Sequence, residues 1–359
     1  MTVTTLETST FDLTAERAVK RERVLELLEG SDSAVWLSSP AAVSWYLGGA
    51  RVHTSLVGPP IAGVLVGRET EQVVTFSNEA DRLATEELPD DVEIRTVPWH
   101  TPLDSAVASL PAVRREAELD AELRAARASV LPRELSRFER LCRESAEILT
   151  AQLSAVTPET TERELSALVA AEILRIGADP VVVMVAGASR LGYKHPLVTD
   201  APVGERAMVV VCARRHGMIA NLSRWVRFGK APASEAEGEH RLLQVEAAYL
   251  SATRTGRVLG DVLADGAAAY AAQGFPADEW QNHHQGGAAG YAGRDPRAVP
   301  GISDLVQDRQ LFAWNPSAAG QKVEDTVILE GDQIRPLTVD PDWPTVSVNG
   351  IERPVTLQR

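Results

Sequence analysis

The stretch RAMVVVCARRHGMIANLSRWVRFG, residues 206–229, decides the fold of this protein. Two runs rich in Val, Ile, Leu and Trp lie on either side of His216 and Gly217. Runs of this composition bounded by turn residues are typical of β-strands. We therefore predict two consecutive strands that turn around His216 and Gly217.

Helices are predicted on both sides of this hairpin. Upstream, Thr161 is followed three residues later by Glu164, which is a capping box, and an apolar stripe follows it. Downstream, helical spacing predicts one helix over about 239–254 and a second over about 258–273. The C-terminal stretch 311–338 is expected to form three strands joined by turns.

The first third of the chain alternates helix and strand patterns. A helix is predicted to end at Gly30, and four short strands and one more helix are expected at 34–37, 61–66, 72–76, 92–97 and 79–87. The charged, Ala-rich stretch 110–138 is interpreted as a linker helix or a bridge. The sequence thus predicts an α/β (α+β) protein with an N-terminal domain over 1–132 and a second domain over 133–359.

Composition limits the classes of function. The chain has 359 residues, 44% hydrophobic and 24% charged, and a formal net charge of -14, which opposes nucleic-acid binding. The N-terminal residues lack the pattern of a secretory signal, and no run of about 18 apolar residues predicts a membrane span. Cys142 and Cys212 are expected to be reduced thiols. We predict a cytoplasmic protein.

Six motifs in this order resemble the creatinase and aminopeptidase P family, whose catalytic domain has the pita-bread fold. They are LSSPAAVSWYLGG (37–49), TPETTEREL (157–165), YKHPLVTDAPV (193–203), GMIANLSRWVRFG (217–229), NHHQGGAAGYAGRD (282–295) and FAWNPSAAGQKVEDTVIL (312–329). The resemblance implies a creatinase-like N-terminal domain, a pita-bread catalytic domain, a homodimer and a small-molecule substrate.

Peptidases of this family hold two divalent ions with two aspartates, a histidine and two glutamates. The resemblance puts these positions at Val210, Asn221, Gly287, Asn315 and Glu324. Valine and glycine side chains supply no donor atom, and a neutral amide is a poor ligand beside carboxylates. One anionic ligand cannot hold two dications about 3.5–4 Å apart. We therefore predict no dinuclear metal site and no cofactor.

The adjacent histidines 283 and 284 raise the question of a different metal site. Neighbouring side chains in an extended segment point to opposite faces, so we expect that both rarely bind one ion. A mononuclear site that combines one of them with His195 and Glu324 stays open as an alternative. The other interpretation is that one histidine packs in the structure while the other faces the cleft.

Catalysis without a metal has a precedent within the resemblance. Creatinase cleaves a C–N bond with a histidine as proton carrier, and that histidine matches His195. A neutral imidazole can take a proton from water and return it to a leaving nitrogen. Glu324 is predicted to orient the ring, and His284 to act with them. The alternative for His195 is a turn residue fixed by Pro196.

Further polar residues are predicted to bind substrate. They include His283 and Gln285. His284 and Gln285 are expected at the cleft wall, where they can donate to a developing oxyanion or hold a substrate carbonyl. The amides of Asn221 and Asn315 suit a polar or anionic ligand, and Arg224 either braces the sheet or contacts the ligand.

The resemblance also implies that the N-terminal domain of a partner subunit covers the cleft. It would present Arg51 and His53, and an arginine suits a substrate carboxylate.

The leading hypothesis is a metal-independent hydrolase acting on a C–N bond of a small amino-acid-like or guanidino substrate. The alternatives are an Xaa-Pro aminopeptidase-like metallopeptidase, a lyase or isomerase that works by proton abstraction, and a non-catalytic binding protein on the same fold.

Overall fold

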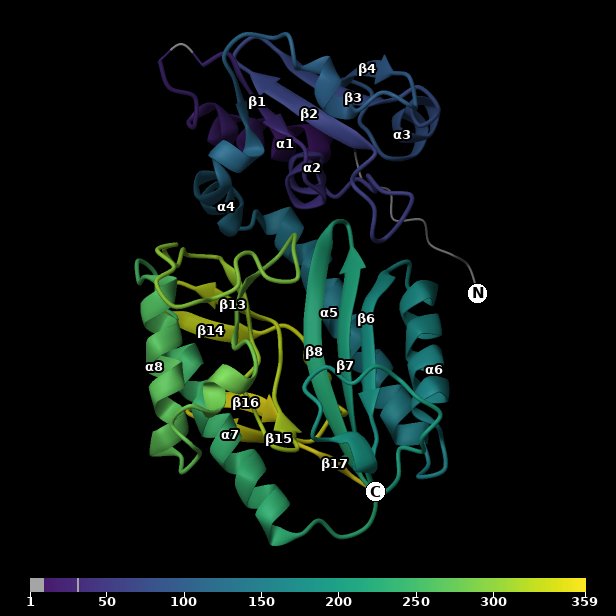
Figure 1. Cartoon of the computed structure of the whole chain (residues 1–359), viewed down its shortest axis with the longest axis vertical. Helices are drawn as coiled ribbons and strands as arrows, with labels where there is room; N and C mark the ends of the chain where they lie inside the picture. The colour runs from purple at the N-terminus through teal and green to yellow at the C-terminus, as the bar shows by residue number, and fades with distance from the viewer. Residues whose placement is uncertain (1–9, 31) are drawn as a thin grey trace. The chain divides into compact units, whose positions relative to one another are not determined.

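The computed structural model describes residues 10–30 and 32–359, and the chain divides into two compact units, Met1–Arg127 and Ala128–Arg359 (Figure 1). We call them the N-terminal and the C-terminal unit. The division lies within helix α4 (Asp120–Ala128). None of the helices in the described part of the chain is both long enough and apolar enough to cross a membrane.

The N-terminal unit is built around a five-stranded sheet. Its strand order is β4-β3-β2-β1-β5, with antiparallel pairs at β3–β2 and β2–β1 and parallel pairs at β4–β3 and β1–β5. The predicted strands and the helix between them are confirmed to within a residue or two. The elements are α1 (Thr10–Leu25), β1 (Ala34–Leu37), α2 (Pro40–Tyr46), β2 (Ala62–Gly67), β3 (Glu71–Phe76), α3 (Ala80–Glu86), β4 (Glu93–Val97) and β5 (Val113–Arg115).

The interpretation of residues 110–138 as one linker helix is wrong in its first part. Val113–Arg115 forms strand β5, which pairs in parallel with β1 through Ala34 and Trp36. The local composition is charged, but the open edge of β1 offers backbone hydrogen bonds that outweigh helix propensity. Helix α4 and helix α5 (Pro132–Ala155) follow as separate elements.

The core of the N-terminal unit is packed around Trp36. This side chain is 1% exposed, and its indole nitrogen donates to Asp104 at 2.7 Å. The ring lies against Gly63 on the neighbouring strand β2, where an added Cβ atom would come within 2.2 Å of it. The sheet therefore needs glycine at position 63 for a steric reason.

The long hairpin predicted from residues 206–229 is confirmed in the C-terminal unit. Strands β7 (Arg206–Arg215) and β8 (Met218–Arg227) pair from Arg206↔Arg227 to Arg215↔Met218. The two turn residues His216 and Gly217 both have positive φ, 51° and 74°. A two-residue turn of this kind matches the right-handed twist of the strands it connects.

The hairpin belongs to a four-stranded sheet of order β17-β8-β7-β6. Helices α5 and α6 contact its strands (Figure 1). The Thr161–Glu164 capping box at the start of α6 is confirmed, with the Glu164 amide donating to Thr161 Oγ1 at 3.1 Å. The remaining elements are α6 (Glu162–Arg175), β6 (Asp179–Ala186) and β17 (Leu357–Gln358).

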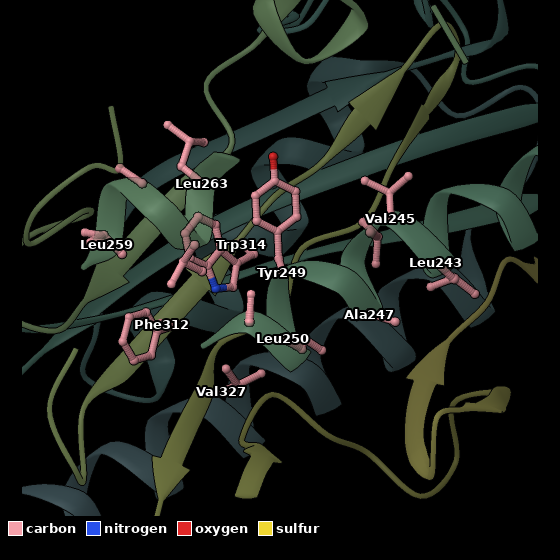
Figure 2. Close-up of a cluster of buried hydrophobic side chains, with 14 of the residues drawn as sticks. Leu243, Val245, Ala247, Tyr249, Leu250, Leu259, Leu263, Phe312, Trp314 and Val327 are labelled. Carbon is pink, nitrogen blue, oxygen red and sulfur yellow. The ribbon is translucent and has the colours of Figure 1, made fainter. Parts of the chain in front are cut away.

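A second sheet forms the other half of this unit, in the order β14-β13-β10-β9. Together with helices α7 and α8 it encloses a core in which Tyr249 stacks on Trp314, with ring centroids 4.7 Å apart (Figure 2). The two predicted helices are confirmed, although α7 begins earlier than expected. The prediction of three strands over 311–338 is corrected, because the short strands β11 and β12 form an additional pair between β10 and β13. The elements are α7 (Ala233–Ala252), α8 (Leu259–Ala272), β9 (Gly286–Ala289), β10 (Leu311–Trp314), β11 (Ser317–Ala318), β12 (Gln321–Lys322), β13 (Val327–Glu330), β14 (Gln333–Pro336), β15 (Thr345–Val348) and β16 (Ile351–Pro354).

Buried ion pairs join the two halves of the C-terminal unit. Asp325 accepts from Arg224 on β8 at 2.9 Å and from Arg353 on β16 at 2.8 Å. Arg353 also binds Glu246 on α7, with its Nε atom 2.7 Å from the carboxylate. Opposite charges compensate one another here, which is what makes their burial tolerable.

We predict that Gly63→Ala lowers the free energy of unfolding by about 1–3 kcal/mol, because the new methyl group overpacks the buried Trp36 ring. Urea unfolding followed by tryptophan fluorescence measures this change. Gly58→Ala is the control, since its added Cβ meets Ser55 at an ordinary contact distance of 3.4 Å. Equal stability of Gly63→Ala and the wild type would contradict the packing described here.

Candidate functional site

Three histidines converge in the C-terminal unit. Nε2 of His283 lies 3.3 Å from Nε2 of His195, so one ring donates a hydrogen bond to the other. The rings of His283 and His284 stack with centroids 4.3 Å apart, and the rings of His195 and His284 stack at 5.7 Å. One ring nitrogen of each residue lies within 4.8 Å of the others. We call these three residues the histidine cluster.

The expectation that His283 and His284 point to opposite faces is wrong. Strict alternation holds along the pleat of a strand. These residues instead lie in the connection between the short 3-10 helix Glu279–Asn282 and strand β9. Their rings therefore stack on one another, with His283 buried and His284 half-buried.

Gln285 holds the connection between the 3-10 helix and β9 in place, and it is not a substrate ligand. Its side-chain oxygen accepts from Tyr270 at 2.8 Å, and its amide donates to the carbonyls of Trp280 and His283 at 2.8 and 2.6 Å. The side chain is 2% exposed. Because its oxygen and its amide nitrogen are both engaged inside the protein, the predicted contact with substrate is corrected to a structural role.

The loop that carries His195 is held at both ends by Glu162. This carboxylate is fully buried and accepts from the amide of Gly187 at 2.9 Å and from the amide and hydroxyl of Thr199 at 2.9 and 2.8 Å. Arg190 donates to it as well. The start of helix α6 thus closes loop 187–199, on which His195 is exposed.

Glu324 lies in an internal cluster of charges. It is 2% exposed, Arg294 donates to its Oε1 atom at 2.6 Å, and the Lys322 ammonium lies 3.0 Å from Oε2. Burial alone would raise the pKa of Glu324, but the charges of Lys322 and Arg294 lower it to about 2. The predicted pairing of Glu324 with His195 is therefore corrected, because both carboxylate oxygens face other partners.

Asn221 belongs to the same cluster. Its Oδ1 atom accepts from Arg294 at 3.0 Å and from the Cys212 thiol at 3.2 Å, and its Nδ2 atom donates to the Ile219 carbonyl. The side chain is fully buried. These contacts correct its predicted role in substrate binding, since both polar atoms of the buried amide are bonded to protein groups. Burial raises the pKa of Cys212 to about 12, so this thiol is not a nucleophile.

The field at the histidine cluster is positive. Burial lowers the pKa of His283 to about 2 and that of His284 to about 3, and nearby cations add to the effect, Lys322 at His283 and Arg294 with Lys322 at His284. Burial also lowers the pKa of His195. All three imidazoles are therefore neutral at neutral pH, and His283 and His284 are weak proton acceptors there.

A small cavity lies beside His283. It measures about 10 Å³ and is lined by side chains that include Lys194, Lys322 and Ser317. A volume of this size with several polar partners suits a single water molecule.

Solved structures match this chain over most of its length. A prolidase from Pyrococcus horikoshii OT3 matches with a TM-score of 0.73 and 17% identity, covering 89% of this chain and 98% of that one. An X-Pro aminopeptidase from Thermotoga maritima MSB8 matches with a TM-score of 0.73 and 17% identity over 95% and 100% of the two chains. The N-terminal domain of the FACT complex subunit SPT16 from Cicer arietinum matches with 0.67 and 15%, over 91% and 96%. No family model and no curated protein sequence matches.

The chain has the pita-bread fold. The fold predicted from the sequence motifs is therefore confirmed, with an N-terminal α/β unit followed by the pita-bread unit.

The pita-bread positions assigned to a metal pair do not fit two dications here. A side chain at Gly287 would meet the backbone of Pro296 and Ala298 within 2.6 Å. Val210 packs with Met208 and Trp225 in an apolar cluster. Asn221 and Glu324 are tied to Arg294, whose guanidinium would repel a metal ion.

Three more of the predicted site residues can be placed. Arg224 is 3% exposed and binds Asp325 and the Thr338 carbonyl, so its predicted contact with substrate is corrected to bracing of the sheet. Oδ1 of Asn315 is buried and has no hydrogen-bond partner among the residues that the structure describes, and its role toward a ligand stays a prediction.

Arg51 lies in the N-terminal unit, where it is exposed and pairs with Glu87. Its contact with a partner subunit's cleft stays a prediction, as does that of His53.

Sequence reasoning missed Arg294, Lys322 and Glu162. The first two lie in motifs that were recognised, GYAGRD and GQKVED. A buried glutamate without metal ions requires compensating charge, and this requirement could have pointed to the cations beside it in those motifs. Glu162 lies in the helix start TTEREL. An acidic residue is favoured there by the helix end alone, so the motif offers no further reason to single it out.

We predict that Glu162→Gln lowers the free energy of unfolding by about 1–3 kcal/mol at pH 7, because a charged acceptor of several buried hydrogen bonds is lost. These bonds lower the pKa of Glu162 although burial alone would raise it. Its contribution is therefore complete above the ordinary glutamate pKa of about 4.3 and is lost as the pH falls through the lower folded value.

Urea unfolding at pH 7 and in the acid range measures this contribution. Glu172→Gln is the control, since Glu172 pairs with the exposed Arg175 on the same helix. The role of Glu162 in closing the loop would be refuted if Glu162→Gln had the wild-type free energy of unfolding at pH 7 and if this free energy changed with pH in the acid range as it does in the wild type.

We also predict that Arg294→Met costs about 3–5 kcal/mol, because it leaves the buried Glu324 short of positive charge. The double variant Arg294→Met with Glu324→Gln should recover part of this loss, with a coupling of about 1–3 kcal/mol. Arg297→Met is the matched control, since this exposed neighbour should change stability by less than about 0.5 kcal/mol. Strictly additive losses in the cycle would show that the two residues do not interact.

Proposed function

We propose that this protein is a metal-independent hydrolase that cleaves a C–N bond in a small amino-acid-like or guanidino substrate, with a histidine as general acid and base. The observation that carries this proposal is the neutral imidazole pair His195–His283 beside a cavity for one water molecule. The proposal includes the loss of the metal pair used by peptidases of this fold. The contacts of Asn221, Gly287 and Glu324 support that loss.

The proposed reaction is hydrolysis of the C–N bond with an imidazole that first accepts and then donates a proton. His195 takes a proton from water as the water oxygen bonds to the substrate carbon, because burial makes His283 too weak a base for this step. The C–N bond then breaks, and its electron pair leaves with the nitrogen, which receives the same proton from the imidazolium. The water supplies OH to the carbon and H to the nitrogen, so the atoms balance.

Fixed positive charge supports the proposed step. Lys322 lines the cavity beside His283, and Lys194 lines it from the His195 loop. An ammonium group held in place stabilises negative charge that develops on the reacting centre. The same field favours a substrate that carries a carboxylate. His284, stacked on both other rings, is proposed to hold this substrate in place.

The test uses untagged protein treated with a chelator and a panel of small N-acyl and guanidino carboxylates, with the released amine or urea measured by mass spectrometry. We predict turnover that survives chelation and falls by about 10²–10⁴-fold in His195→Asn. His240→Asn is the control, because His240 is an exposed histidine on helix α7. Full activity of His195→Asn would dismiss the role of this residue.

Two other outcomes would overturn parts of the proposal. Activity that disappears with the chelator and returns with divalent ions would favour the metallopeptidase alternative. A product that carries solvent deuterium on carbon, without net addition of water, would favour a lyase or isomerase.

A non-catalytic binding protein is the second candidate. The match to a subunit of a protein complex shows that this architecture is also found in a complex subunit, and the small size of the cavity beside His283 is compatible with a closed site. Thermal stabilisation by members of the same panel without turnover would favour this candidate.

A further inference from the structure

The histidine cluster has a second property that acid–base chemistry does not require. Three imidazoles from two separate segments bring one nitrogen each within 4.8 Å of the others. Two of these nitrogens, Nε2 of His195 and Nε2 of His283, are already 3.3 Å apart. Imidazole nitrogens bind zinc at about 2.0–2.1 Å, so two donors of a tetrahedral ion lie about 3.3–3.4 Å apart. This pair therefore already has the spacing of two metal ligands.

Unsatisfied atoms add a second, independent observation. The Nδ1 atoms of both His283 and His284 are buried and have no hydrogen-bond partner in the described part of the chain. A buried polar atom without a partner is costly in a native structure unless a water, an ion or a ligand satisfies it. The orphan Nδ1 atom of His284 is open to an ion in the cluster, whereas Nδ1 of His283 cannot bind the ion that its Nε2 atom contacts.

We propose that His195, His283 and His284 form a binding site for a single transition-metal dication of the Zn²⁺, Ni²⁺, Co²⁺ or Cu²⁺ type. This site differs from the metal pair of pita-bread peptidases, because it uses three neutral nitrogen donors and no carboxylate. A site with three protein ligands leaves a further position for water or an anion.

Movement of His195 can bring the third donor into range. His195 is exposed on its loop, whereas His283 is buried and His284 half-buried. A change of its side-chain torsions can therefore adjust the cluster without disturbing the core, and a spacing of up to 4.8 Å needs to shorten by about 1.5 Å. The bridge between Gly287 and Arg297 keeps the strand that follows His284 in a fixed place.

The donor atoms select the kind of ion. Lys322 lines the cavity beside His283, and the positive charges of Lys322 and Arg294 are partly compensated by Glu324, which both of them bind. Hard cations such as Mg²⁺, Ca²⁺ and Mn²⁺ require oxygen ligands, preferably carboxylates, and gain little here. Ions that prefer imidazole retain a strong interaction, in the order Mn²⁺ < Co²⁺ < Ni²⁺ < Cu²⁺ > Zn²⁺.

A bound ion would also regulate the site. It would occupy the imidazole lone pairs that accept the proton of water, so occupancy inhibits the hydrolase activity. This consequence rests on the proposed function, whereas the binding itself does not.

The experiment titrates chelator-treated, untagged full-length protein with Co²⁺, followed by its visible absorption bands, and then displaces Co²⁺ with Zn²⁺. Elemental analysis of the protein after dialysis against Zn²⁺ gives the stoichiometry. We expect one equivalent of metal, no competition by a large excess of Mg²⁺, and at least a ten-fold weaker affinity in His195→Asn, His283→Asn and His284→Asn.

Two control variants make the result specific. His240→Asn removes a histidine outside the cluster and should leave binding unchanged. Glu324→Gln removes the carboxylate of the charge cluster and should also retain binding, since the site uses nitrogen donors alone. Circular dichroism checks that each variant is folded.

Three results would overturn the metal-site proposal. They are no uptake of Co²⁺ or Zn²⁺ by the wild type, uptake of two equivalents that Glu324→Gln abolishes, and uptake that the three cluster variants do not weaken. Each of these results is measured without following turnover. A failure of the proposed hydrolase activity therefore leaves the metal-binding result unchanged, and a failure of metal binding leaves the activity result unchanged.

Discussion

A buried carboxylate needs positive charge, and in this protein two side chains supply it to Glu324. Arg294 and Lys322 hold its two oxygens at 2.6 and 3.0 Å, inside a region that is almost closed to solvent. Two divalent ions in the same place would meet a guanidinium already bonded to Asn221 and Glu324. The hydrolase proposed above therefore relies on imidazole groups in place of metal ions.

The pita-bread fold holds Glu324 and the loop of His195 in fixed positions. Asp325, next to Glu324 in sequence, is bound by Arg224 on β8 and by Arg353 on β16, and the Ser223 amide donates to the Glu324 carbonyl. Earlier in the chain, Glu162 closes the loop that carries His195. Buried charges thus fix both Glu324 and the loop that carries His195.

The overall fold could be predicted from the sequence because its strongest patterns are local. The hairpin turn at His216 and Gly217, the capping box at Thr161 and the strands of the N-terminal unit each follow from a few neighbouring residues. Strand β5 could not be predicted in this way, because its charged sequence forms a strand only through pairing with β1. Pairing between distant segments leaves no local pattern.

The site was predicted less completely for the same reason. His195, His283, His284 and Glu324 were identified as chemistry-bearing residues, and the three histidines do converge. Partners were assigned wrongly where the outcome depended on long-range contacts. Glu324 pairs with Arg294 and not with His195, and Gln285 bonds inside the protein.

Anomalous X-ray scattering from crystals soaked in Mn²⁺ and Co²⁺ distinguishes a pair of ions at Glu324 from the Arg294 guanidinium. We predict that density between Asn221 and Glu324 belongs to this guanidinium and contains no anomalous peak, and that any Co²⁺ peak lies among the three imidazoles. Two anomalous peaks bridged by Glu324, with Arg294 displaced, would contradict this prediction.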